Sequence, residues 1–228
     1  MIKVSNLSVS FSEKHVLKDI SVDFLPSKIY GIVGLNGAGK TTFFNTLGGL
    51  IKPCNGTISW NENVITHKEI AYLETVNFFY SRITGREYLD IFKQTNTDFN
   101  LEILQQYLKL PLDELIEKYS TGMKKKLALL GILKQNRSIF VLDEPFNGLD
   151  LETNKVLEII IAQLKEKGKT ILLSSHIIDP LLKFCDEILF LENGVFTKTF
   201  KKDDFQKIEA EVFGKFKEEA ALKIAAAI

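Results

Sequence analysis

The tightest constraint on the fold of this chain comes from a short glycine-rich stretch, Gly34-Leu35-Asn36-Gly37-Ala38-Gly39-Lys40-Thr41-Thr42. The stretch fits the pattern G-x-x-x-x-G-K-[ST], which forms a phosphate-binding loop. Residues 29–33 before it are apolar and predict a buried strand, and residues 41–50 after it predict a helix. A strand, a glycine loop and a helix in this order surround one anion with backbone N–H groups, a helix N-terminus and an ammonium group. The stretch therefore predicts a phosphate site.

Each residue type in this loop has a chemical reason to be there. Glycine adopts positive φ angles without strain and lets the backbone approach a phosphate closely. We expect the Lys40 ammonium to reach the β- and γ-phosphates of a nucleotide, the Thr41 hydroxyl to hold Mg²⁺, and Thr42 to contact the α-phosphate. The predicted nucleotide-binding residues of the loop are Gly34, Asn36, Gly37, Ala38, Gly39, Lys40, Thr41 and Thr42.

The composition limits which partners the chain can have. At 228 residues, 45% of them apolar, it can bury a substantial core. The 29 basic residues balance the 29 acidic ones, so nothing predicts bulk attraction to nucleic acid or to an anionic membrane. No apolar run approaches the roughly 20 residues of a spanning helix, and the N-terminus does not resemble a signal peptide. The two cysteines, Cys54 and Cys185, are expected to be free thiols, buried or partly buried, as in a reducing cytoplasm.

The hydrophobic pattern predicts three structural parts. Residues 1–28 alternate between apolar and polar and predict an antiparallel sheet with one face in water. Residues 82–135 predict a helical block that a capping box at residues 84–87 opens. From residue 138 onward, strands and helices alternate, which predicts a mostly parallel sheet covered on both faces. The ligand of such a sheet lies at the carboxyl ends of its strands.

We therefore predict an α/β protein with a P-loop NTPase core and a mostly parallel sheet. It carries an N-terminal antiparallel β-subdomain and an inserted helical subdomain of about residues 82–135. Residues 1–228 are predicted to form a single domain, and within it residues 99–118 are predicted to be helical with a break near Pro111. The mixed-charge residues 203–228 predict a further helix.

A second apolar strand, residues 139–142, ends in two carboxylates, Asp143 and Glu144. Burying a strand that ends in two acids costs free energy unless the acids have partners. On its own, such a strand is more often followed by ordinary surface acids, but here a phosphate loop lies upstream. We therefore expect Asp143 to hold Mg²⁺ through water, and Glu144 to orient and deprotonate an attacking water.

Two weaker signals lie elsewhere in the chain. Ser120 and Gly122 precede an apolar helix and would form a second anion site at its N-terminus, although a plain helix cap is the commoner role. His176 follows the strand at residues 171–174. A histidine at the carboxyl end of a neighbouring strand can hydrogen-bond a γ-phosphate, although a lone histidine is usually a satisfied polar residue.

Taken together, these motifs resemble those of the ATP-binding cassette (ABC) ATPases, in order and spacing, over essentially the full chain. The two Walker motifs correspond to residues 34–42 and 140–144, and the signature motif to residues 120–124. Residues 147–150, ending in Asp150, resemble the D-loop, and His176 the switch histidine. Phe11 lies where the family has an aromatic that stacks on adenine.

The resemblance implies a mechanism in which two cassettes pair head to tail. ATP on the Walker side of one cassette would be closed over by Ser120 and Gly122 of the other, with Asp150 at the interface. Glu144 would activate water and His176 would steady the γ-phosphate. Closing and opening of the pair would drive a conformational change in a partner.

The resemblance also implies cofactors and partners. These are ATP and Mg²⁺, a separate transmembrane permease, and a second ABC subunit in a homodimer or heterodimer, with no nucleic acid. The chain would be cytoplasmic, held on the inner face of the cell membrane through the permease.

The chain departs from the family pattern in two places. The glutamine usual in the loop after residues 70–73 is absent; Thr75 stands at its place, and Glu74 is a second candidate to replace it. The signature reads Ser-Thr-Gly-Met in place of a form with two glycines and glutamine, which is similar to cassettes of export-type (ABC-2-like) transporters.

Three functional hypotheses follow. The first is the ATPase subunit of a two-component transporter, an exporter, whose docking face is formed by residues 75–118. The second is a soluble ABC protein that acts on ribosomes or DNA, which the single cassette and the lack of long heptads disfavour. The third is a nucleotide-gated regulatory module with little turnover. Glu144 and His176 argue against it, and the missing loop glutamine argues weakly for it.

Overall fold

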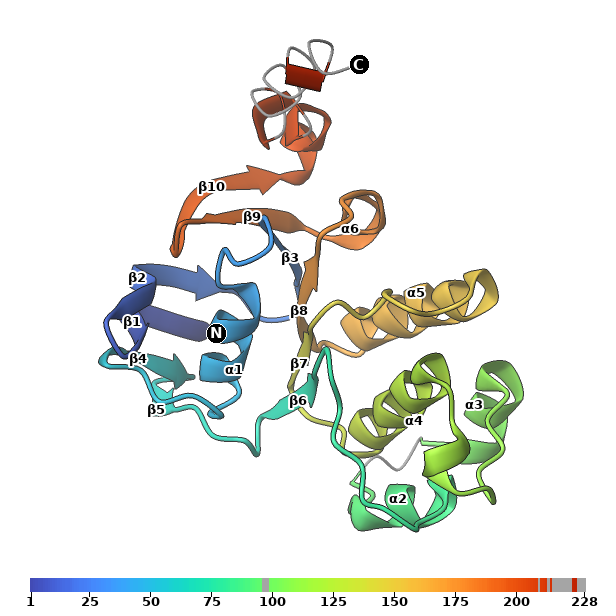
Figure 1. Ribbon diagram of the computed structural model, residues 1–228. Helices are drawn as coiled ribbons and strands as arrows, with labels where there is room; N and C mark the ends of the chain where they lie inside the picture. Colours follow the sequence, from blue (N-terminus) through green and yellow to red (C-terminus); the bar gives the residue numbers. More distant parts are fainter. Residues whose placement is uncertain (96–98, 209, 213, 215–222, 225–228) are drawn as a thin grey trace.

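The computed structural model describes residues 1–95, 99–208, 210–212, 214 and 223–224, and the described strands form two sheets (Figure 1). The first has four strands in the order β2-β1-β4-β5, and the second has six in the order β10-β9-β3-β8-β7-β6. The bounds of the first are β1 (Ile2–Phe11), β2 (Lys14–Phe24), β4 (Asn55–Trp60) and β5 (Asn63–Val64). Those of the second are β3 (Ile29–Val33), β6 (Ile70–Leu73), β7 (Ile139–Leu142), β8 (Thr170–Ser175), β9 (Glu187–Glu192) and β10 (Val195–Lys201).

The directions of the strands agree with the sequence-based prediction. Neighbouring strands of the first sheet are antiparallel. In the second sheet β3 is parallel to β8 and β9, and β7 is parallel to β6 and β8, whereas β10 is antiparallel to β9. Strands β3, β7 and β8 are buried along their whole length, which explains the apolar sequences of β3 and β7 and of residues 171–173 in β8. The loops after β3, β6, β7 and β8 therefore meet at one edge of the sheet.

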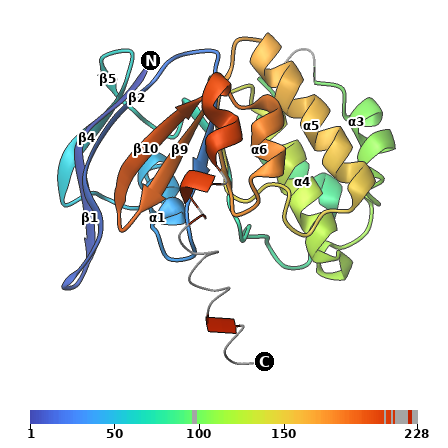
Figure 2. The same cartoon turned by 90° about the horizontal axis from the view of Figure 1, so that it is seen from above.

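Helices and the first sheet cover the two faces of the second sheet (Figures 1 and 2). One apolar cluster joins it to α1 (Lys40–Leu47) and to the antiparallel strands. The other joins it to α4 (Thr121–Lys134), α5 (Leu151–Glu166) and α6 (Asp179–Phe184). Within β8, Leu172 belongs to the first cluster, and Ile171 and Leu173 belong to the second. The α/β architecture predicted from the sequence is confirmed.

The helical part contains α2 (Gly85–Ile91), α3 (Leu101–Leu108), the short 3-10 helix η1 (Ile116–Lys118) and α4. The predicted capping box is present, because the Thr84 hydroxyl accepts from the Glu87 N–H and the Glu87 carboxylate accepts from the Thr84 N–H. The predicted break near Pro111 in the helical residues 99–118 is present, but it is longer than expected and extends from the end of α3 to the start of η1. Lys109 ends α3 in the left-handed region (φ 53°) and Pro111 follows, so the helix cannot continue. The boundaries 82–135 of a helical subdomain stay a prediction.

Other sequence-based expectations have mixed outcomes. The predicted helix over residues 203–228 is replaced at its start by the 3-10 helix η2 (Lys202–Lys207), and most of the remainder lies outside the described residues. Both cysteines are free thiols; Cys185 is buried as expected, but Cys54 is exposed because it lies in a surface loop before β4. Across the part of the chain that the structure describes, every helix is too short or too polar to cross a membrane.

Candidate functional site

The predicted phosphate loop connects β3 to α1 and has the expected backbone. Gly37 and Gly39 have φ angles of 82° and 109°, in the region that favours glycine. Gly39 is the N-cap of α1, so the first N–H groups of the helix point out of the loop. The Lys40 ammonium is buried and donates to the carbonyl oxygen of Gly34 at 2.7 Å. A positive group and free helix N–H groups are therefore held at one place, ready for an anion.

A cavity of about 660 Å³ opens on this loop. Its lining combines predicted and unpredicted residues. The predicted ones are Asn36, Gly37, Gly39, Lys40, Thr41, Thr42 and Glu144, together with Thr75. The unpredicted ones are Lys14, His15, Val16 and Lys18 of β2 and the turn residues Asn193 and Gly194.

The turn between β9 and β10 closes one side of this cavity, which the sequence reasoning missed. The Lys18 N–H donates to the Gly194 carbonyl oxygen at 2.9 Å. A Cβ at Gly194 would lie 2.2 Å from the carbonyl oxygen of Val16, so only glycine allows the turn to lie against β2. The sequence signal was present, since Asn-Gly predicts a hairpin, but it does not say that the hairpin contacts a strand far away in the sequence.

Asp143 is the most deeply placed polar group of the site. Its carboxylate is fully buried, at 0% exposure, and one oxygen accepts from the hydroxyls of Thr41 and Thr75, both at 2.7 Å. The other oxygen accepts from the Ser174 hydroxyl. The three side chains among the described residues that hydrogen-bond this buried carboxylate are all neutral hydroxyls, which leave its negative charge without a directly bonded cation. Oxygen ligands of this kind suit Mg²⁺, which is held through one or two carboxylates together with substrate phosphates, so the residues present fit the predicted metal.

Thr75, which stands at the place of the missing loop glutamine, contacts Asp143 directly. It follows β6, lines the cavity and donates to the same Asp143 oxygen as Thr41. Glu74 does not touch Asp143 through a described hydrogen bond. Burial and the Asp143 charge raise the pKa of Glu74.

Glu144 occupies an unusual backbone position directly after Asp143. Its φ angle is +49°, in the left-handed region that a residue other than glycine rarely adopts. Three contacts hold it there. Its N–H donates to the Ser174 hydroxyl at 2.9 Å, its carbonyl oxygen accepts from the buried Lys125 ammonium at 2.7 Å, and its carboxylate lies 2.8 Å from His176 Nδ1. Strain held by surrounding contacts is typical of functional sites.

The residues predicted to form the second anion site lie elsewhere. The Ser120 hydroxyl caps α4 by accepting from the Met123 N–H at 3.2 Å. Gly122 packs so closely that a Cβ would lie 2.9 Å from the Gly148 carbonyl oxygen. Neither residue lines the cavity over the phosphate loop, and α4 and α1 are well separated in both views (Figures 1 and 2). These two residues are not brought to the phosphate loop of their own chain.

Phe11, predicted to stack on adenine, lies at the end of β1 and is 49% exposed. It pairs with Lys14 in the turn between β1 and β2. The cavity lining includes Lys14 and His15 of this turn but not Phe11. The role of Phe11 therefore stays a prediction.

The structural role of Asp150 as the N-cap of α5 can be tested by itself. It caps α5, because its carboxylate accepts from the Thr153 N–H at 2.7 Å, and these bonds, with Lys126, lower its pKa to about 2. Asp150→Ala should lower the free energy of unfolding by about 1 kcal/mol, whereas Asp150→Asn should keep the cap. The lowered pKa means that the contribution is complete above pH 3.8 and is lost as the pH falls towards 2. Urea unfolding of the three proteins at neutral and acidic pH checks this; an acid-dependent loss of stability as large in Asp150→Asn as in the unaltered chain would contradict it.

Comparison with known proteins identifies the family. The model of the ABC transporter family matches residues 17–147, more than half of the chain. The chain belongs to the ABC transporter family. It is 34% identical over 200 residues to an uncharacterised ABC transporter ATP-binding protein of Methanocaldococcus jannaschii, covering 85% of this chain and 74% of the relative. It is 31% identical over 221 residues to the bacitracin transport ATP-binding protein BcrA of Bacillus licheniformis, covering 91% and 72%.

A solved structure of an ATP-binding subunit of an ABC transporter has the same fold. Its TM-score is 0.83 at 27% identity, and the match covers 94% of this chain and 93% of that one. These findings confirm the predicted family, the fold, and the class of nucleotide-binding ATPase subunit of an ABC transporter. They favour that class over the soluble ribosome- or DNA-acting ABC protein and over the regulatory module.

Proposed function

We propose that this ABC transporter subunit hydrolyses ATP at the cavity over the phosphate loop and thereby powers export through a separate permease. One observation carries the proposal. Thr41, Asp143 and Glu144 meet at one edge of the sheet, beside the buried ammonium of Lys40. This arrangement provides a phosphate cradle and a general base that line one cavity, and a metal position at Asp143, which Thr41 of the same cavity contacts.

We propose the following roles for the residues, which the contacts of the site support. The phosphate loop and Lys40 bind and orient the β- and γ-phosphates, and Thr42 contacts the α-phosphate. Thr41 and Asp143 would hold Mg²⁺, which would neutralise charge on the phosphate oxygens when bound. Glu144 accepts a proton from the attacking water, and His176, at 2.8 Å from its carboxylate, orients it and contacts the γ-phosphate. Hydrolysis then depends on positioning and charge stabilisation.

The working unit we propose is a head-to-tail pair of cassettes. Ser120 and Gly122 lie away from the phosphate loop of their own chain, so they can close over ATP only when a second subunit presents them. Asp150 is connected to α4, the helix that Ser120 caps, because Lys126 of α4 donates to its carboxylate at 3.3 Å. Lys125 of the same helix donates to the carbonyl oxygens of Glu144 and Asn147. Within one chain, α4 therefore connects Ser120 and Gly122, which would close the partner's site, to Glu144, the general base of the chain's own site.

The proposed docking face for the permease is residues 75–118. Three apolar side chains of the loop between β6 and α2, Val76, Phe78 and Tyr80, are exposed at 83%, 73% and 56%. Phe78 and Tyr80 stack edge to face with ring centroids 5.3 Å apart. Exposed aromatic groups of this kind mark protein contacts. Contact with the permease would hold the subunit on the cytoplasmic face of the membrane, and the Ser-Thr-Gly-Met signature supports export.

Co-purification tests the partner. We expect the subunit to be recovered from membranes with a protein of about six apolar segments of roughly 20 residues, encoded beside it. The double change Phe78→Ser with Tyr80→Ser should release it from membranes without changing ATP binding. If the docking face extends to α3, the paired change Ile103→Ser with Tyr107→Ser on that helix should also release the subunit from membranes. Strict recovery with ribosomes would contradict the proposal.

The missing glutamine gives a further prediction. Thr75→Val removes one donor from Asp143 at constant volume, so we expect the Mg²⁺ concentration that half-saturates ATP binding to rise about tenfold. ATP affinity in EDTA should not change, because Thr75 contacts the metal ligand and not the phosphate loop. Glu74→Gln is the matched control and should leave both values unchanged. The opposite ranking of the two variants would assign the role to Glu74.

A further inference from the structure

The ammonium group of Lys125 is bonded to two backbone carbonyl oxygens beside the catalytic edge of the sheet. Lys125 belongs to α4 and is 7% exposed. It donates to the carbonyl oxygen of Glu144 at 2.7 Å and to that of Asn147 at 2.8 Å. Burial lowers the pKa of Lys125, which means that its charged form is kept at a cost in free energy. An apolar side chain would avoid this cost, so the packing of α4 alone does not account for a cation at this position.

The backbone of Glu144 is strained at the point where Lys125 contacts it. Its φ angle is +49°, whereas a residue before proline, here Pro145, favours an extended backbone with negative φ. Because Pro145 has no N–H, the peptide group between these two residues forms hydrogen bonds through its carbonyl oxygen alone. That oxygen accepts from the Lys125 ammonium and from the Asn147 N–H, which is 3.2 Å away. Lys125 therefore holds a peptide group whose conformation is unfavourable by itself.

The direction of the Glu144 carboxylate depends on this backbone. A change of φ at Glu144 would turn its side chain away from His176, whose Nδ1 is 2.8 Å from the carboxylate. A catalytic group that is misplaced by about 1 Å can cost a factor of roughly 10² in rate. A bond to the backbone of Glu144 can therefore control what its side chain does.

We propose that Lys125 is a positioning residue for ATP hydrolysis. Its ammonium holds the turn at residues 144–147 so that the Glu144 carboxylate faces the nucleotide cavity, which Glu144 lines. Lys125 is absent from the lining of that cavity, so it acts through Glu144. The inference rests on the proposed role of Glu144 as the general base.

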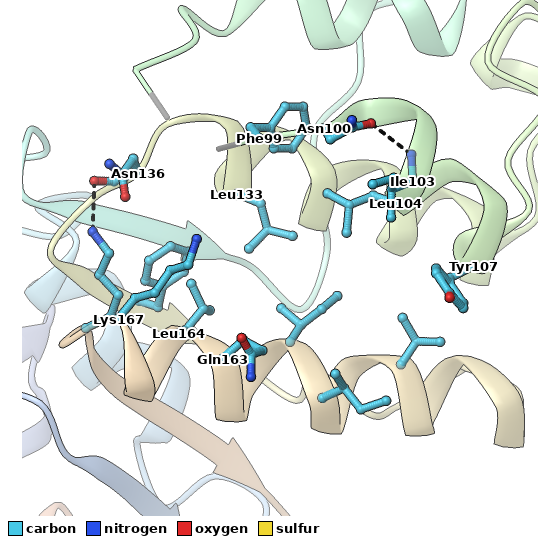
Figure 3. A pocket seen from close by; sticks show the side chains of 15 residues that line it. Phe99, Asn100, Ile103, Leu104, Tyr107, Leu133, Asn136, Gln163, Leu164 and Lys167 are labelled. Atoms are coloured by element: carbon cyan, nitrogen blue, oxygen red, sulfur yellow. Dashed lines mark hydrogen bonds between the residues drawn. The ribbon is translucent and has the colours of Figure 1, made fainter. Parts of the chain in front are cut away.

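The opposite end of α4 provides a matched control. Lys134 is the last residue of α4, and its ammonium donates to the Leu89 carbonyl oxygen at 2.8 Å. Beside it, Leu133 lines an apolar cavity of about 490 Å³ between α3 and α5 (Figure 3), which shares no lining residue with the nucleotide cavity. Lys134→Met therefore removes the same kind of bond from the same helix, away from the catalytic edge.

Steady-state ATP hydrolysis and titration with a fluorescent ATP analogue test the proposal on the full chain. Lys125→Met removes the charge and should lower kcat by about 10–100-fold without changing ATP affinity, because the base is misplaced while the phosphate loop is intact. Lys125→Gln keeps an amide donor and should give an intermediate kcat. Lys134→Met should change neither value. A loss of kcat as large in Lys134→Met as in Lys125→Met would reflect a general loss of helix stability and would overturn the proposal.

The Glu144→Gln background tests whether Lys125 acts through Glu144. If it does, Lys125→Met should not lower the residual turnover of Glu144→Gln any further, since the group that it positions is already gone. A loss in this background as large as in the unaltered chain would mean that Lys125 acts on another group, and the proposal would be wrong.

Amide hydrogen exchange of the full chain without nucleotide gives a readout that needs no turnover. Lys125→Met should accelerate exchange of the Asn147 amide, which bonds to the Glu144 carbonyl oxygen, by about tenfold or more, and Lys134→Met should not. Unchanged exchange would overturn the proposal. If the unaltered chain shows no ATP turnover, the proposed function is contradicted, and the exchange comparison alone decides whether Lys125 holds the turn. Thermal melts show which variants fold; if Lys125→Met does not, Lys125→Gln replaces it in every comparison.

Discussion

Glu144→Gln should lower ATP turnover by about 10²–10⁴-fold while leaving ATP binding almost unchanged. The substitution keeps the size of the side chain but removes the carboxylate that would accept the proton from water. It also keeps a hydrogen-bonding partner for His176, whose Nδ1 is 2.8 Å from the Glu144 carboxylate. The contacts of the backbone to Ser174 and Lys125 do not involve the side chain and should survive. The loss should therefore appear in kcat and not in KM.

The same variant tests the head-to-tail pair. If ATP is bound but not hydrolysed, two cassettes closed over it should stay together, and gel filtration with ATP should show a dimer that the unaltered chain does not accumulate. Glu192→Gln, at an exposed position on β9, is the matched control and should change neither turnover nor assembly. Unchanged phosphate release from Glu144→Gln would show that Glu144 is not the general base. Absence of a dimer with ATP would contradict the head-to-tail pair.

A variant at the same position separates chemistry from backbone strain. Glu144→Gly also removes the base, but glycine adopts the φ angle of +49° without cost. We expect it to be as inactive as Glu144→Gln and at least as stable. The difference in the free energy of unfolding between Glu144→Gly and Glu144→Gln would measure the strain of holding a residue other than glycine at this φ angle.

The sequence predicted those parts of the site that a local pattern defines. The phosphate loop and the acidic end of β7 are each contained in a short run of residues. Their meeting follows from the rule that parallel strands end at one edge. The polar end of β8 shows the same logic, since its buried Ser174 donates to Asp143. The mostly parallel sheet and the family resemblance followed from such local features together.

The remaining features depend on contacts between distant segments. Thr75 was considered only as an alignment position, and its bond to Asp143 depends on how β6 packs beside β7. The turn at Asn193 reaches the cavity only because β9 lies beside β3. The positive φ angle of Glu144 has no residue-type signal, because the residue is not glycine. These features are determined by tertiary packing, which no local sequence pattern predicts.

Lys40→Ala should weaken ATP binding by about 10–100-fold and lower turnover by at least 10²-fold. The Lys40 ammonium is 8% exposed and is held 2.7 Å from the Gly34 carbonyl oxygen, so it meets phosphate with little reorganisation. Alanine removes the charge but keeps the helix start at Gly39. Titration with a fluorescent ATP analogue measures binding.

Lys18→Ala is the matched control; this lysine lines the same cavity but is exposed to water. Since water screens an exposed charge, its loss should have a small effect. Equal effects of the two variants would show that the cavity attracts nucleotide by general charge alone, and that the phosphate loop does not bind it.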